Sequence, residues 1–167
     1  MNKKMRQYLG LLTAVVAYYG IHEGAHLIYA LATGIFKEIK ILGLGVQIDV
    51  YAEQMTQTQL GIFCLVGALA TFLTAWGLIL AAPRICRWKS SVCRAVCYYI
   101  TIAMLVADPI YLGLLAPFVG GGDLNGIAYL LPRPVAQGVF LGLLLLHGWA
   151  FWKILLPQYQ KSFQDTP

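Results

Sequence analysis

Hydrophobic and polar positions along the chain divide it into four long apolar stretches separated by shorter polar segments. A helix needs about 20 largely apolar residues to span a bilayer, and each stretch is long enough. Because backbone polar groups cannot stay unpaired in lipid, all four are predicted to be helices. They run from about Tyr8 to Thr33, Gln59 to Ala82, Val92 to Phe118 and Val135 to Leu156.

The polar segment 34–58 has a different period. Val46, Ile48 and Val50 alternate with Gln47 and Asp49, close to two glycines. Alternation with a period of two around glycines predicts a β-hairpin, and an irregular amphipathic loop at the membrane interface is the alternative.

The predicted fold class is therefore an all-α polytopic membrane protein. It has about four transmembrane helices, with a small membrane-associated β-hairpin after the first one. Residues 1–157 are expected to form a single integral-membrane domain, and residues 158–167 a short, loose polar tail.

Composition strengthens the membrane interpretation. Hydrophobic residues make up 59% of the 167 residues and charged residues only 11%, whereas an ordinary soluble domain is about 45–50% apolar and about 25% charged. So few charges cannot coat a soluble globule. A disordered chain, a nucleic-acid-binding module and an ordinary cytosolic enzyme are excluded on these grounds.

Basic residues mark the ends of the apolar stretches and so indicate topology. If the N-terminus is cytoplasmic, nine of the twelve Lys and Arg residues lie on the cytoplasmic side: Lys3, Lys4, Arg6, Arg84, Arg87, Lys89, Arg94, Lys153 and Lys161. Both termini are therefore expected inside. The first apolar run is too long for a cleaved signal. The compact chain without recognisable targeting signals favours a bacterial plasma membrane, and the sequence leaves the oligomeric state open.

Three polar residues interrupt the first apolar stretch as a His-Glu-x-x-His motif: His22, Glu23 and His26. Residues four apart lie about 40° apart on one helix face, so both imidazoles can bind one Zn²⁺. Glu23 can then reach a coordinated water without being a ligand. This arrangement is typical of metalloproteases, with the glutamate as general base. The alternative is a hydrogen-bonded cluster that only helps helices pack.

A catalytic zinc site needs a third protein ligand. The candidates are Asp108, Asp123 and His147. By their depth along the helices, both aspartates lie near the histidines, so depth does not decide between them. Asp123 is in a glycine-containing segment that is able to fold back. His147 lies midway along the last helix and is better explained as a packed histidine or a donor to substrate.

The pattern resembles the site-2 protease family of intramembrane zinc metalloproteases. The features occur in the family's order over roughly residues 8–131: the motif HEGAH, a hairpin-like segment at 34–45, a helix of small residues at 61–74, and a proline- and glycine-containing stretch at 116–123. The chain departs from the family in having Gly-Asp-Leu-Asn-Gly in place of Leu-Asp-Gly. Without a PDZ insertion, it resembles a minimal core.

The resemblance implies an activity and assigns residues to it. Asp123 would be the third zinc ligand, and Asp108 would lie near the family's asparagine-proline region, in a supporting or substrate-contacting role. Asn125 is a further candidate for contact with substrate. The expected substrates are membrane-associated proteins or peptides. Alternatives are a zinc hydrolase acting on another bond, and a non-catalytic protease-like membrane protein that binds a metal or a partner helix.

Overall fold

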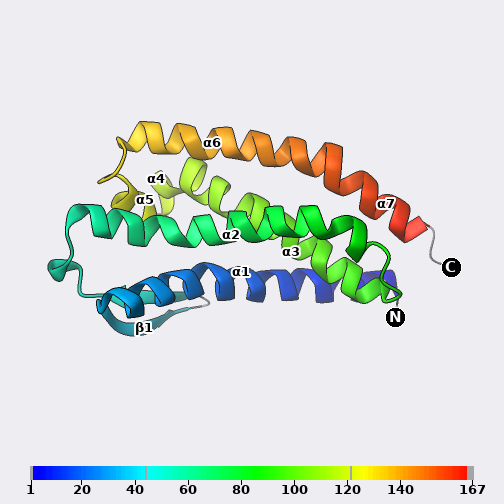
Figure 1. Cartoon of the computed structure of the whole chain (residues 1–167), viewed down its shortest axis with the longest axis horizontal. Coiled ribbons are helices and arrows are strands. Elements are labelled where there is room, and N and C mark those ends of the chain that lie inside the picture. Colours follow the sequence, from blue (N-terminus) through cyan, green and yellow to red (C-terminus); the bar gives the residue numbers. More distant parts are fainter. Residues whose placement is uncertain (1, 44, 121, 165–167) are drawn as a thin grey trace.

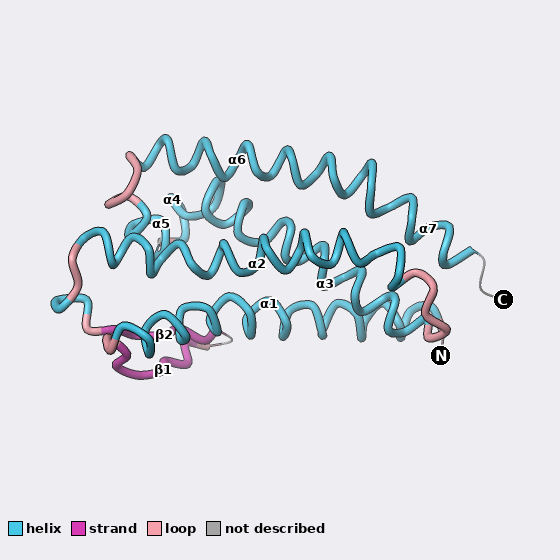
Figure 2. The backbone as a smooth tube through the Cα atoms, viewed as in Figure 1, coloured by secondary structure: helices cyan, strands magenta, loops and turns pink. Residues whose placement is uncertain are grey.

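The computed structural model describes residues 2–43, 45–120 and 122–164, which are mostly helical with one two-stranded sheet. Long helices run side by side along the longest axis of the molecule, and the sheet lies against α1 at one end of the bundle (Figures 1 and 2). The long helices are α1 (Lys3–Thr33), α2 (Gln57–Ile85), α3 (Ser91–Ile110) and α6 (Arg133–Ala150), with α7 (Leu156–Gln164) continuing the last of them.

Three helical stretches in the described part of the chain are long and apolar enough to span a membrane: Gln57–Ile85, Ser91–Val119 and Arg133–Gln164. They coincide with the last three predicted spans. Helix α1 has 31 residues, a length of about 46 Å, but its polar His-Glu-x-x-His motif lowers its hydropathy. A fourth span formed by α1 therefore stays a prediction.

The predicted β-hairpin is confirmed. Strand β1 (Phe36–Leu42) pairs antiparallel with β2 (Gly45–Val50), and a short 3₁₀ turn, Ala52–Gln54, follows. Gly34 ends α1 with a φ of +73°, a left-handed conformation that glycine adopts readily. Leu44, within the predicted hairpin turn, lies outside the described residues.

The winding of the chain changes at the end of α3. Pro109 lacks the N–H that would bond to the carbonyl of Leu105, and the π-helical segment Tyr111–Leu115 follows it. The Nδ1–H of His147 on α6 donates to the freed Leu105 carbonyl over 2.7 Å. The chain continues through α4 (Ala116–Val119) into α5 (Gly122–Ile127).

The prediction of a loose tail is wrong as far as Gln164. A π-helical segment, Phe151–Leu155, leads directly into α7. Tyr159 is only 1% exposed and belongs to the same apolar cluster as Ile79 and Leu105. The buried Tyr159, with the partly buried Phe163, therefore docks this otherwise polar helix, and the average composition of the segment gives no sign of it. Residues 165–167 lie outside the described part.

Candidate metal centre

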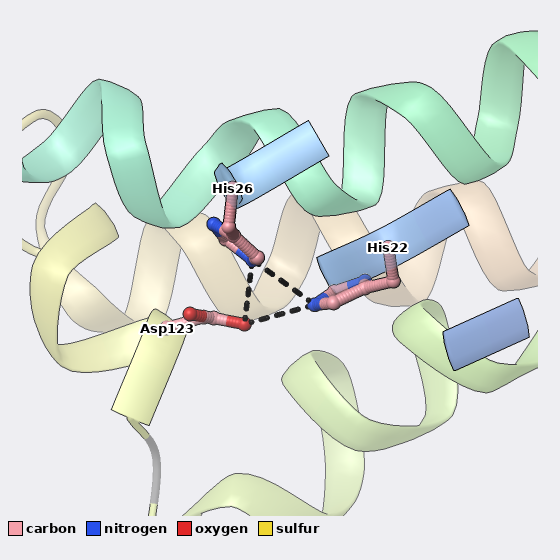
Figure 3. Close-up of side chains that lie close together, drawn as sticks. All are labelled: His22, His26 and Asp123. Carbon is pink, nitrogen blue, oxygen red and sulfur yellow. Dashed lines mark hydrogen bonds and ion pairs between the residues drawn. The ribbon is translucent and has the colours of Figure 1, made fainter. Parts of the chain in front are cut away.

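Three side chains with metal-ligating atoms converge between α1 and α5 (Figure 3). The Nε2 of His22 lies 3.2 Å from the Nε2 of His26 and 3.3 Å from the Oδ2 of Asp123. The Nε2 of His26 lies 3.8 Å from the same oxygen. All three atoms carry lone pairs, so a group packed this closely requires a shared proton or a cation between them.

The local backbone explains why these side chains meet. His22 and His26 are one turn apart on the same face of α1, as predicted. Asp123 stands in the first turn of α5, just after Gly120, whose φ of +84° reverses the chain. The hydroxyl of Tyr111 donates to the Gly120 carbonyl over 3.0 Å and so ties down the turn. The predicted fold-back is therefore observed, with Gly121 outside the described residues.

Helix α2 closes one side of the centre through Gly67. A Cβ atom at this position would lie 2.5 Å from the Nε2 of His26 and 2.8 Å from the Nε2 of His22. Real Cβ atoms do not approach other atoms this closely, so only glycine lets α2 pack against both imidazoles. The ring of Phe63, one turn earlier on α2, lies 4.8 Å from the ring of His26.

Asp108 lies behind His22 rather than beside the three converging atoms. Its Oδ1 is 3.1 Å from the Nδ1 of His22, the distance of an ion pair but without the alignment of a hydrogen bond. The carboxylate is fully buried and accepts hydrogen bonds from Tyr18 on α1, over 2.6 Å, and from Thr71 on α2. Three helices thus hold this carboxylate against the far nitrogen of His22.

Glu23 connects the centre with the hairpin. Its Oε2 accepts a hydrogen bond of 3.3 Å from the backbone N–H of Ile48 on β2. Glu23, the two histidines and Asp123 line a cavity of about 520 Å³, together with residues 45–48 of β2. A half-buried carboxylate therefore faces the same space as the three ligand atoms, and one strand of the hairpin forms a wall of that space.

Two predicted substrate contacts are not brought to this cavity. His147 is 1% exposed and both its nitrogens are engaged, Nδ1 with the Leu105 carbonyl and Nε2 with the indole N–H of Trp76 at 3.4 Å. It satisfies the carbonyl that Pro109 leaves free and does not line the cavity. Asn125 is exposed on α5 and is not among the lining residues either.

Several residues of the site could not be predicted from the sequence. Gly67 and Thr71 lie in the run of small residues at 61–74, and small residues four apart serve close packing in most membrane helices. Tyr18 and Tyr111 are aromatic residues in apolar segments, without a pattern that distinguishes them. The only available signal for Thr71 was its place on the same α2 face as Gly67, one turn away.

Comparison with protein-family models, with curated proteins and with solved structures finds no significant match for this chain. The resemblance to the site-2 protease family therefore rests on sequence motifs alone and stays a prediction.

Proposed function

We propose that this chain is an intramembrane zinc metalloprotease that hydrolyses peptide bonds of membrane-associated substrates. The observation that carries the proposal is the convergence of His22, His26 and Asp123, with Glu23 on the wall of the same cavity. A site that only stored a metal would have no use for a fourth side chain, the half-buried carboxylate of Glu23, held apart from the ligand group.

The donor set fits zinc in number, chemistry and spacing. Two imidazoles and one carboxylate are three of the ligands Zn²⁺ prefers, and a catalytic site leaves the fourth position open. With metal–ligand distances of about 2.0–2.2 Å, tetrahedral ligand atoms are separated by about 3.3–3.6 Å. The separations of 3.2, 3.3 and 3.8 Å lie close to that range.

A zinc ion held by these residues would acidify a coordinated water and polarise the carbonyl of the scissile bond. Glu23 accepts a proton from the attacking water and delivers it to the leaving amine. Its hydrogen bond to the Ile48 N–H fixes the carboxylate beside β2. Asp108 holds the His22 ring by its far nitrogen, a supporting contact that raises ligand basicity.

The hairpin provides a place for an extended substrate. Because the N–H of Ile48 bonds to Glu23, it points away from β1 and toward the cavity. An extended segment added along this edge of β2 would pass the ligand group and Glu23. A helical substrate must unwind first, since its carbonyls are otherwise hydrogen-bonded within the helix.

The proposal includes four spanning helices in a bacterial plasma membrane, with both termini cytoplasmic. The outer face of α1 supports the fourth span, because its side chains are compatible with lipid. Leu12, Val16, Ile28 and Leu31 are each 59–70% exposed, whereas His22 and His26 turn inward and are 6% and 3% exposed. With this division, α1 places these aliphatic side chains against lipid and its two histidines against the bundle.

The decisive experiment compares Glu23→Gln with Glu53→Gln. Glu53 is an exposed glutamate in the turn after the hairpin and serves as the matched control. We expect one zinc per chain in all three purified proteins, with cleavage of casein and of membrane-anchored helical reporters by the wild type and Glu53→Gln. Glu23→Gln should lose at least 100-fold in rate, the scale of a lost general base.

Two results would reject the proposal. The first is a wild-type protein, purified without chelators and supplied with zinc, that holds less than stoichiometric metal. The second is equal cleavage by Glu23→Gln and wild type, since the carboxylate would then take no part in the reaction.

A further inference from the structure

A second cavity lies at the opposite end of the bundle from the hairpin. Its volume is about 570 Å³, and its walls come from the first turns of α1, the start of α3, and α7. These segments meet where the N-terminus and the end of α7 lie side by side (Figure 1). The proposed metalloprotease chemistry makes no use of this cavity.

The polar lining of this second cavity is cationic. Lys3 and Arg6 line it, together with the amide side chains of Gln7 and Gln160. The guanidinium of Arg6 lies 5.0 Å from the centre of the Phe163 ring, a cation–π distance that holds it beside the cavity. The guanidinium of Arg94, which donates to the Trp88 carbonyl, approaches the same ring at 5.6 Å.

No described carboxylate offsets the charges of Lys3 and Arg6. Within the described ranges, neither Lys3 nor Arg6 forms an ion pair with an acidic side chain. The described carboxylates lie on or beside the hairpin or at the candidate metal centre: Glu23, Glu38, Asp49, Glu53, Asp108 and Asp123. Asp165 lies outside the described residues. The first turn of α1 also carries the positive end of the helix dipole.

The remaining walls are apolar and aromatic. Ala95, Leu156 and the rings of Tyr98 and Tyr99 line the cavity beside the cations. Ends of spanning helices lie at the level of lipid headgroups, where tyrosines are enriched and where basic pockets between helices bind anionic headgroups. A ligand with a phosphate at one end and hydrocarbon at the other matches this combination of walls.

We propose that the cavity binds the headgroup phosphate of an anionic phospholipid. Lys3 and Arg6 contact the phosphate, and the amides of Gln7 and Gln160 contact the neighbouring polar groups. The part of an acyl chain nearest the headgroup lies against Ala95 and Leu156. A bound lipid would join α1, α3 and α7 at this end of the bundle.

The test uses the purified full-length protein in detergent and counts bound lipids by native mass spectrometry. Phosphatidylglycerol and phosphatidylcholine are titrated separately into the wild type, the double variant Lys3→Gln/Arg6→Gln, and Lys4→Gln. Lys4 is an exposed neighbour on the same helix end that does not line the cavity, so it controls for general charge. A second variant, Gln160→Glu, places a carboxylate in the cavity at an exposed position and keeps the test decisive should the double variant fold poorly.

We expect the wild type and Lys4→Gln to bind the first phosphatidylglycerol at least tenfold tighter than phosphatidylcholine. This preference should fall to about twofold or less in the double variant and in Gln160→Glu, with zinc content unchanged in both. Equal losses in Lys4→Gln would show a diffuse electrostatic effect and overturn the proposal. Inorganic phosphate binding as tightly as the lipid, with the same dependence on Lys3 and Arg6, would also overturn it, because the occupant would then be free phosphate.

Discussion

At the scale of single residues, Gly67 determines how closely α2 approaches the two histidines. The side chain of Gly67→Ala would occupy the space beside both Nε2 atoms, within 2.5–2.8 Å. We therefore expect this variant to lose at least tenfold in zinc affinity, because the imidazoles must move apart. Zinc content by elemental analysis and affinity by competition with a chelating dye measure the effect.

Gly77, on the same helix, is the matched control for this substitution. A Cβ at Gly77 meets no atom within 4 Å, so Gly77→Ala should bind zinc normally. It should gain up to about 1 kcal/mol in stability from the better helix propensity of alanine. Normal zinc affinity in Gly67→Ala would show that the ligand group does not bind metal in the observed arrangement.

The buried carboxylate of Asp108 provides a second test at this scale. Asp108→Asn keeps the size of the side chain but removes the charge that faces the Nδ1 of His22. Loss of such a supporting contact typically weakens metal binding by about 10–100-fold, and we expect that range from zinc titrations. Thr71→Val, which leaves the carboxylate in place, should weaken binding less. Complete loss of zinc in Asp108→Asn, with Asp123→Asn unaffected, would make Asp108 the ligand instead.

The residues of the centre differ in how far the sequence could predict them. His22, Glu23 and His26 were predictable because helix periodicity alone fixes their relative positions. Asp108 and Asp123 were not separable by depth, since their roles depend on how the chain turns after Pro109 and at Gly120. The importance of Gly67 depends on a contact between two helices, which no local pattern encodes.

At the scale of elements, ion pairs connect the two strands of the hairpin. Asp49 on β2 lies 2.6 Å from Lys40 and 3.2 Å from Lys37, both on β1. Hydrogen bonding to Lys40, and next to Lys37, lowers the pKa of the Asp49 carboxyl below its ordinary value. The bond to Asp49 in turn raises the pKa of the Lys40 ammonium. Both groups are therefore charged across the neutral range.

The signs of these shifts fix the pH dependence of the hairpin. The contribution of Asp49 is fully present above the ordinary pKa of aspartate and is lost as pH falls through its lowered pKa. The contribution of Lys40 is lost only as pH rises through its raised pKa. Titration of the Asp49 carboxyl carbon by NMR should give a midpoint below that of a free aspartate, and Lys40→Gln should move it upward. A midpoint at or above the free value would contradict the ion pair.

Sequence patterns predicted one element, the hairpin, and failed to predict another, helix α7. Alternation with a period of two correctly predicted the hairpin: on β2, Ile48 is buried and its neighbour Gln47 is exposed. The polar composition of residues 158–164 did not predict a helix, because Tyr159 and Phe163 dock α7 through contacts with α3 that are distant in sequence. Long-range packing of this kind overrides local composition.

At the scale of the whole molecule, the burial pattern of α1 bears on whether this helix crosses the membrane. Its motif makes it less apolar than the other long helices, yet it packs lengthwise against α2 and α3. Burial of the two histidines removes much of the cost of their polarity, since the side facing outward is made of large aliphatic residues. Hydropathy along a sequence cannot include this effect, because it counts buried and lipid-facing residues alike.

Cysteine accessibility decides the topology. In a background without the four native cysteines, Lys4→Cys, Glu53→Cys and Lys89→Cys place single thiols at the start of α1, after the hairpin and after α2. If α1 spans the bilayer, a membrane-impermeant maleimide added to intact cells should label Glu53→Cys alone, because the other two positions face the cytoplasm. Labelling of both Lys4→Cys and Glu53→Cys would place α1 on the surface, and the metal centre would then lie at the interface instead of within the bilayer. Labelling of Lys89→Cys but not Glu53→Cys would invert the orientation predicted from the basic residues.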